Sequence, residues 1–160
     1  MTNSDKILRT ELKKQIYGNQ AHISLEAALT GFPFHRAGDH YGNLEHTMWT
    51  LVWHIRFCQD DIIDYVLNEN YKDAKFPEGY WPDSDAPTDK EEWEQTLKGI
   101  QTGLKTLEAW IETEDLFAPL KNNPDHNLYR QITIIAQHNS YHCSQILDLR
   151  RLLGLPLREY

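Results

Sequence analysis

The chain has 160 residues, with 24 acidic and 16 basic side chains, and its net charge at pH 7 is −8. A chain of this charge, without a dense stripe of lysine and arginine, repels phosphate backbones and anionic lipids, so we expect no nucleic acid and no membrane as partner. The hydrophobic fraction of 40% is ordinary for a globular protein, and we expect one folded domain over residues 1–160.

Two helices are predicted in the first half of the chain. The first starts at Ser4, a suitable N-cap, and ends at Gly31, although Gly18 inside it weakens the helical pattern. The second follows a loop rich in glycine, proline and histidine and runs from about Leu44 to Leu67. In both segments apolar residues recur at mostly helical spacing, so each helix should turn one apolar face towards a core.

Two further helices are predicted after a long connection, residues 68–90, which carries three prolines and no helical period. Thr88 has the pattern of an N-cap that forms a capping box with Glu91. The last helix is expected from about Asn127 to Leu153, just before a glycine. Because a connection this long can cross the length of a bundle, we predict an all-α four-helix bundle with up-down-down-up order.

The two cysteines, Cys58 and Cys143, both fall within predicted helices, and the sequence contains no CxxC pair. A disulfide framework is therefore not expected, which favours a reducing compartment. The polar N-terminal segment does not have the pattern of a signal peptide, and no apolar run reaches the ~18 residues of a membrane span. We predict a cytoplasmic protein.

Three histidines interrupt the apolar faces of two predicted helices. His138 and His142 are four residues apart, so they share one face of the last helix, about 6 Å apart along its axis. His54 lies on the apolar face of the second helix. Burying three polar rings without partners costs several kcal/mol, and a shared divalent cation removes that cost. The pattern indicates a metal site, with histidines that form ordinary hydrogen bonds in the core as the alternative.

The HxxxH spacing is also that of zinc-protease helices, but Asn139 stands where those enzymes have the glutamate that acts as general base. Three histidine ligands would leave a coordination position open, which is typical of catalytic rather than structural zinc sites. A ligand at that position, either water or a thiolate, would have a lowered pKa. Nitrogen ligation suits zinc, nickel, copper and iron and does not choose among them.

Other residues near these histidines have two interpretations each. Tyr141 and Gln145 flank the last two histidines and either orient a ligand or substrate or have ordinary packing roles. Cys58, one turn after His54, is a conceivable fourth ligand, but we favour a small buried apolar side chain. Asp61 is interpreted as a solvated helix residue rather than a general base.

The remaining aromatic and imidazole side chains are expected to have structural or surface roles. Tyr80, Trp81 and Trp93 should anchor the long connection rather than bind a ligand. The other five histidines lie mostly in predicted loops or at helix ends, where surface histidines are common; they are His22, His35, His40, His46 and His126.

Two segments resemble a known family. The stretch TMWTLVWHIRFCQDDII, residues 47–63, is similar to the second-helix signature of the DinB-like (YfiT-type) superfamily. The stretch IIAQHNSYHCSQILDLRRLLG, residues 134–154, resembles its last-helix signature HNxYHxGQI, with Ser144 where glycine is usual. The pattern of Trp81-Pro82 and Ala86-Pro87 in the connection extends the resemblance over nearly the whole chain.

The resemblance implies a four-helix bundle, commonly a homodimer, that holds one divalent metal ion, typically zinc or nickel. One histidine of the second helix and two of the last would be the ligands, which carries over to His54, His138 and His142. Relatives include transferases that act on low-molecular-weight thiols and a thiol-dependent isomerase, although many members have no established activity. A small-molecule substrate and a thiol cosubstrate are therefore expected partners.

Three functional hypotheses follow from these patterns. The first is a metal-dependent thiol S-transferase or hydrolase that uses an open three-histidine site. The second is a non-catalytic metal-binding or stress-response protein, because no residue is an unambiguous general base. The third is a helical bundle without metal, in which the histidines form hydrogen bonds in the core.

Overall fold

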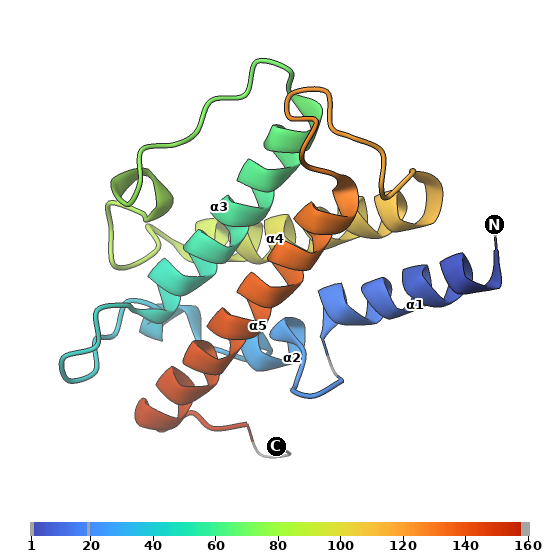
Figure 1. Ribbon diagram of the computed structural model, residues 1–160. Coiled ribbons are helices and arrows are strands. Elements are labelled where there is room, and N and C mark those ends of the chain that lie inside the picture. Colours follow the sequence, from blue (N-terminus) through green and yellow to red (C-terminus); the bar gives the residue numbers. More distant parts are fainter. Residues whose placement is uncertain (1, 19, 158–160) are drawn as a thin grey trace.

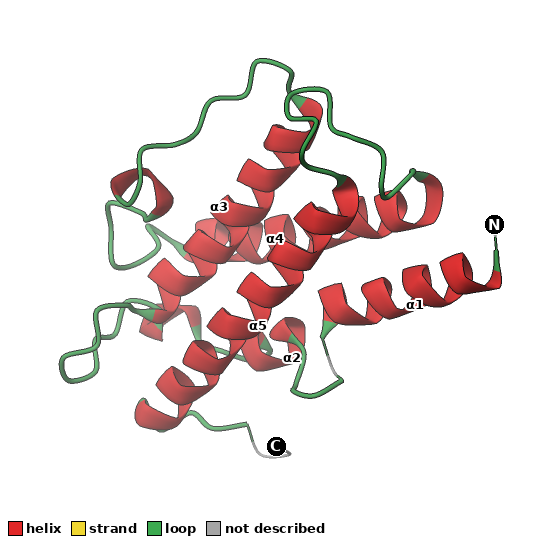
Figure 2. Ribbon diagram, in the orientation of Figure 1, coloured by secondary structure: helices red, strands yellow, loops and turns green. Residues whose placement is uncertain are grey.

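The computed structural model describes residues 2–18 and 20–157, and over these residues it is helical, with loops and no strand (Figure 2). The elements are α1 (Asn3–Tyr17), α2 (Leu25–Leu29), the 3₁₀ helix η1 (Phe34–Arg36), α3 (Met48–Leu67), the 3₁₀ helix η2 (Glu78–Tyr80), α4 (Lys90–Thr113) and α5 (Leu128–Leu152). The prediction of an all-α protein is confirmed. The up-down-down-up order of a four-helix bundle stays a prediction.

The helices pack in a layered arrangement around one core. Helices α3 and α5 lie side by side and run in opposite directions, with α4 behind them (Figure 1). Helix α1 packs against α5 and α4. The short helix α2 packs against α5. Each long helix therefore has partners on its apolar side, as their helical periodicity requires.

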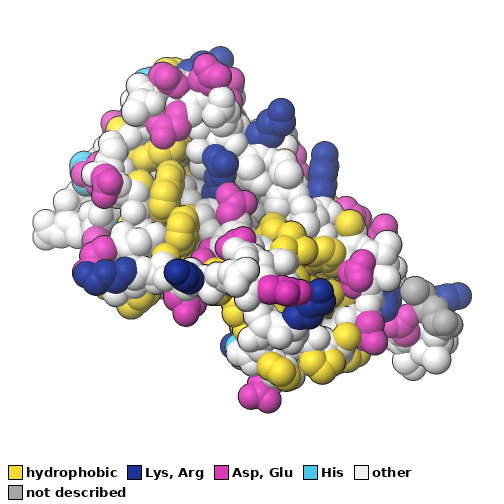
Figure 3. Space-filling model, turned by 90° about the horizontal axis from the view of Figure 1, so that it is seen from above, with side chains coloured by type: hydrophobic (Ala, Val, Ile, Leu, Met, Phe, Trp, Pro, Cys, Tyr) yellow, Lys and Arg dark blue, Asp and Glu magenta, His cyan; other side chains and the backbone are white. Residues whose placement is uncertain are grey.

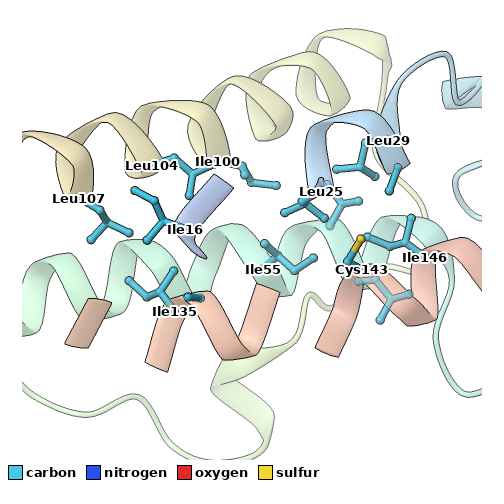
Figure 4. Close-up of a cluster of buried hydrophobic side chains, with 14 of the residues drawn as sticks. Ile16, Leu25, Leu29, Ile55, Ile100, Leu104, Leu107, Ile135, Cys143 and Ile146 are labelled. Atoms are coloured by element: carbon cyan, nitrogen blue, oxygen red, sulfur yellow. The ribbon is translucent and has the colours of Figure 1, made fainter. Parts of the chain in front are cut away.

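The hydrophobic core receives side chains from all five α-helices (Figure 4). Ile55 of α3 and Ile146 of α5 are completely buried, and Leu107 of α4 is completely buried as well. The side chains labelled in the close-up are Ile16, Leu25, Leu29, Ile55, Ile100, Leu104, Leu107, Ile135, Cys143 and Ile146. This core fixes the position of α3 relative to α5, the two helices that carry the predicted ligands.

The N-terminal region differs from the prediction of one helix that extends to Gly31. Helix α1 ends at Tyr17 because Gly18 has a φ of 73°, in the left-handed region that glycine adopts at little cost. Helix α2 then starts afresh, with the Ser24 side chain accepting a hydrogen bond from the backbone N–H of Ala27. The break allows α2 to turn back onto α5.

Two helix starts also differ from the predicted positions. Helix α3 begins later than predicted because Thr47 and Thr50 form a reciprocal capping box. Helix α4 is capped by Asp89 rather than by Thr88, since the Asp89 carboxylate accepts the N–H of Glu92. Thr88 instead donates both its backbone N–H and its hydroxyl to the Glu92 carboxylate.

The long connection between α3 and α4 runs from one end of α3 back to the region of its other end (Figure 1). Its 3₁₀ helix η2 packs against α3. The connection therefore covers the side of α3 on which His54 lies, and it brings backbone and aromatic groups to that histidine.

The surface carries charges of both signs. On the face shown in Figure 3, acidic and basic side chains stand between apolar ones. Among the helices of residues 2–18 and 20–157, none has the length and hydrophobicity needed to cross a membrane.

Candidate metal centre

Three histidines converge where α3 and α5 lie side by side. The Nε2 atom of His138 is 3.0 Å from Nε2 of His54 and 3.1 Å from Nε2 of His142. One nitrogen from each ring lies within 4.8 Å of the other two, with His54 and His142 buried and His138 half-buried. The structure thus brings together the three residues that the helical periodicity and the resemblance had both selected.

Hydrogen bonds behind two of the rings determine which nitrogens carry protons. Nδ1 of His54 lies 2.7 Å from the carbonyl oxygen of Tyr80, so this nitrogen must donate. Nδ1 of His142 lies 2.6 Å from Oε1 of Gln145 and donates in the same way. A neutral imidazole has only one N–H, so Nε2 of both rings presents a lone pair towards His138.

A divalent cation would satisfy this arrangement of nitrogens. Neutral rings of His54 and His142 leave at most one proton, from His138, for three Nε2 atoms that face one another. In a tetrahedral zinc site with Zn–N bonds of 2.0–2.1 Å, neighbouring ligand nitrogens lie about 3.3 Å apart. The two separations from His138 are a few tenths of an ångström shorter, and the third pair of nitrogens lies within 4.8 Å, so side-chain shifts would be needed to admit an ion.

The electrostatic environment keeps the three rings neutral at physiological pH. Burial lowers the pKa of His138 to about 3 and that of His142 to about 4. It also lowers the pKa of His54. Repulsion from the neighbouring imidazoles acts on His138 in the same direction. Because a metal ligand must be unprotonated, this environment favours the ligand form of all three side chains.

Trp81 of the long connection packs directly on the site. Its ring stacks on one side against His54, with centroids 4.0 Å apart and planes within 9°, and on the other side against His46 at 4.0 Å and 8°. The predicted anchoring role of Trp81 agrees with this stack. The residue against which Trp81 packs, His54, is one of the three candidate metal ligands. His46, expected at the surface, is half-buried against Trp81.

Sequence reasoning missed the backbone acceptor supplied by Tyr80. Any residue carries a carbonyl oxygen, so no side-chain pattern marks one that will bind an imidazole. The Trp-Pro pair at positions 81–82 was the available signal that this part of the connection is specifically placed.

The residues predicted to flank the centre differ in their contacts. Gln145 bonds to His142, whereas Tyr141 is exposed and places its ring edge-on to His142 at 5.0 Å. Cys58 Sγ lies 3.6 Å from Nδ1 of His54, but it is not part of the group of atoms that converges on one point. Burial raises the pKa of Cys58 to about 12, so its thiol stays protonated.

The remaining histidines have other partners. His22 lies 2.8 Å from the hydroxyl of Ser140, and His126 lies 2.7 Å from the hydroxyl of Tyr65. His40 lies 3.2 Å from an Asp85 oxygen at the surface. In the part of the chain that the structure describes, none of these side chains joins the three converging rings.

Two cavities border the centre. One, of about 250 Å³, lies beside His138 and is lined mainly by α3 and α5. The other, of about 700 Å³, is lined by none of the three histidines, but its lining includes Tyr141 and Gln145, which contact His142. A third, of about 630 Å³, lies between α2 and α4 and is lined by none of the three histidines.

Comparison with known proteins gives one match. The family model of the DinB superfamily matches residues 20–146, a stretch that contains all three histidines. No curated protein and no solved structure matches the chain. The family resemblance inferred from the two histidine segments is therefore confirmed.

Proposed function

This chain belongs to the DinB superfamily, and from that premise we propose that it binds one divalent metal ion, zinc or nickel, through His54, His138 and His142. The observation that carries the proposal is the convergence of three Nε2 atoms, two of which present lone pairs. The Tyr80 carbonyl and the Gln145 amide would orient the rings and increase their basicity, as partners behind metal ligands commonly do.

We further propose that the protein is a metal-dependent enzyme, a thiol S-transferase or a hydrolase, that acts on a small molecule with a low-molecular-weight thiol as possible cosubstrate. A divalent ion on three neutral imidazoles supplies an open position at which a thiol or water loses its proton more readily. Trp81 stacked on His54 would shield this ligand from water. Tyr141, exposed beside His142, would orient a ligand or substrate in this proposal.

The alternative function is a non-catalytic metal-binding or stress-response protein. It is favoured by one observation: among the described residues, no carboxylate forms a hydrogen bond with any of the three histidines. A reaction that needs a general base would have to recruit one from further away. Activity assays with the metal-loaded protein, over a panel of thiols and electrophiles, separate the two functions.

The proposal also covers the oligomeric state of the protein and its location in the cell. We propose a homodimeric four-helix bundle with up-down-down-up order, as in the family that the sequence resembles. The two free cysteines, Cys58 and Cys143, support a reducing compartment and hence the cytoplasm. Light scattering of the purified protein tests the dimer.

Metal content measured by elemental analysis tests the proposed site. We expect about one zinc or nickel ion per chain in the wild type and its loss in His54→Ala, His138→Ala and His142→Ala. The matched control is His35→Ala, because His35 is exposed and outside the converging group. Full metal content in His138→Ala would contradict the assignment.

A further inference from the structure

The cavity of about 250 Å³ beside His138 has one end at the proposed metal centre. Its lining includes Asp61, Ile62, Tyr80, Ile134, Ile135 and His138. Cys58 and the buried amide of Gln59 also line it, while Ile62, Ile134 and Ile135 supply apolar surface. Pockets for drug-sized ligands have volumes of about 300–1,000 Å³, so this cavity suits a smaller molecule.

Asp61 supplies a carboxylate that forms no ion pair with a cation in the part of the chain that the structure describes. It is half-buried, and one of its oxygens accepts a hydrogen bond of 2.8 Å from the Tyr71 hydroxyl. Over residues 2–18 and 20–157, no lysine, arginine or histidine forms an ion pair with it. Burial raises the pKa of Asp61, and the nearby carboxylates of Asp73 and Asp64 act in the same direction. A cation bound beside Asp61 would stabilise its ionised carboxylate and so oppose these effects on its pKa.

The carboxylate and the metal centre lie on the same side of α3. Asp61 follows His54 by seven residues, or two helical turns, which is about 10 Å along the helix axis. Ile134 and Ile135 of α5 line the cavity together with Ile62 of α3. A ligand in the cavity would therefore have His138 near one end, the Asp61 carboxylate near the other, and the isoleucine side chains along its length, with Cys58 and Gln59 also in the lining.

We propose that this cavity is the substrate pocket of the metal centre, and that Asp61 binds the primary ammonium group of a short aliphatic substrate whose other end reaches the three histidines. The inference rests on the proposed metal site. The apolar walls would take the hydrocarbon spacer, while the single carboxylate would fix its orientation. A charge-assisted hydrogen bond between ammonium and carboxylate is stronger than a neutral one, so the amine would be selected over an alkyl group.

A purely structural role of Asp61 makes a different prediction. If Asp61 served only to hold Tyr71, and with it the start of the long connection, its removal would alter stability but would not distinguish an amine from an alkyl chain. The discriminating quantity is therefore a ratio of two affinities measured on the same protein.

The experiment uses the full chain loaded with zinc or nickel, with metal content measured in each sample. Isothermal titration calorimetry compares ω-aminoalkanohydroxamic acids with alkanohydroxamic acids of the same chain length, since hydroxamates bind metal through the other end. We expect the amine to bind at least ~10-fold more tightly at one chain length, a difference of about 1.4 kcal/mol.

Variants then locate the effect. Asp61→Asn should abolish the preference for the amine while the affinity for the alkyl probe stays within about twofold. Asp64→Asn is the matched control, because Asp64 is exposed on the same helix, and it should keep the preference. Tyr71→Phe retains the Asp61 carboxylate and should also keep the preference for the amine.

Equal affinities for both probe series in the metal-loaded wild type would overturn the inference, and so would a preference that survives in Asp61→Asn. Metal-loaded protein that binds neither series would also overturn it, because the cavity would then not open onto the centre. Protein that takes up no metal would contradict the proposed function, and this inference with it.

Discussion

The hydrogen bonds of Tyr80 and Gln145 decide which nitrogens of His54 and His142 face the centre of the site. They hold each Nδ1 as a donor and so leave Nε2 free as a ligand. Of the two, only Gln145 acts through its side chain, which makes it the accessible position for a test.

Gln145→Leu removes the acceptor behind His142 with little change in size. Partners behind metal ligands typically contribute about 10–100-fold in affinity, so we expect the zinc dissociation constant to rise by at least ~10-fold. Competition with a chromophoric chelator measures this constant. Gln137→Leu, at an exposed position of the same helix, should leave it unchanged. An equal effect of the two substitutions would contradict the role of Gln145.

At the scale of residues, the sequence predicted the candidate ligands because histidines, which can bind metal, stand at positions where helical periodicity predicts a buried face. His138 and His142 share a helix face by spacing alone, and His54 interrupts an apolar stripe. The Tyr80 carbonyl and the stack of Trp81 on His54 depend on how a connection without regular structure folds back. No periodic pattern encodes that path.

At the scale of elements, α3 and α4 approach closely at two glycines. A Cβ atom at Gly103 would lie 2.6 Å from Oε1 of Gln59, whose side chain is almost completely buried. A Cβ atom at Gly99 would lie 2.5 Å from Nε of Arg56, a long side chain that is partly exposed and can move aside. The close contacts at the two glycines are similar in length, but the Gln59 side chain is held in the core whereas the Arg56 side chain can move.

We therefore expect opposite consequences of alanine at these two positions. Gly103→Ala should lower the free energy of unfolding by about 1–3 kcal/mol, because the buried neighbour cannot shift without strain. Gly99→Ala should be neutral or stabilising by up to about 1 kcal/mol, since alanine has the higher helix propensity. Urea unfolding measures both, and equal destabilisation would contradict this account of the α3–α4 contact.

The helix boundaries show which local signals were decisive. The predicted start of the last helix at about Asn127 is confirmed: α5 begins at Leu128, and the Asn127 side chain caps it by accepting the N–H of Arg130. The single N-terminal helix was wrong, since apolar spacing continues through Ile23 across the break that Gly18 introduces. The periodicity of apolar residues predicts which face of a helix is buried, but it does not predict the positive φ of a single residue such as Gly18.

At the scale of the whole molecule, stability should depend on pH through the three histidines. Their pKa values are lowered in the folded chain, to about 3 for His138 and about 4 for His142, whereas an unfolded histidine titrates near 6.5. The unfolded chain then binds more protons, so the metal-free folded state loses stability as the pH falls from 6.5 towards these lower values.

Urea unfolding of the metal-free protein between pH 6.5 and pH 4.5 should show a loss of free energy on the order of a few kcal/mol. His138→Asn removes the ring with the lowest pKa and should reduce this loss, which separates the histidines from other titrating groups. The same loss in wild type and variant would contradict the neutral state of His138.

The all-helical fold and the family follow from the sequence because both depend on patterns that run along whole helices. The proposed substrate pocket does not follow in this way, since α3, α5 and the long connection form the cavity together. Asp61 illustrates the difference: the sequence favoured a solvated helix residue over a general base, whereas the structure places Asp61 in the lining of the cavity beside His138.

X-ray absorption spectroscopy of the zinc-loaded protein tests the central claim most directly, because it reports the atoms bound to the ion. The account predicts three imidazole nitrogens at about 2.0–2.1 Å and one further light atom at the open position. In a sample free of added thiol, sulfur at about 2.3 Å, which would identify Cys58 or Cys143 as a ligand, or fewer than three imidazoles, would contradict it.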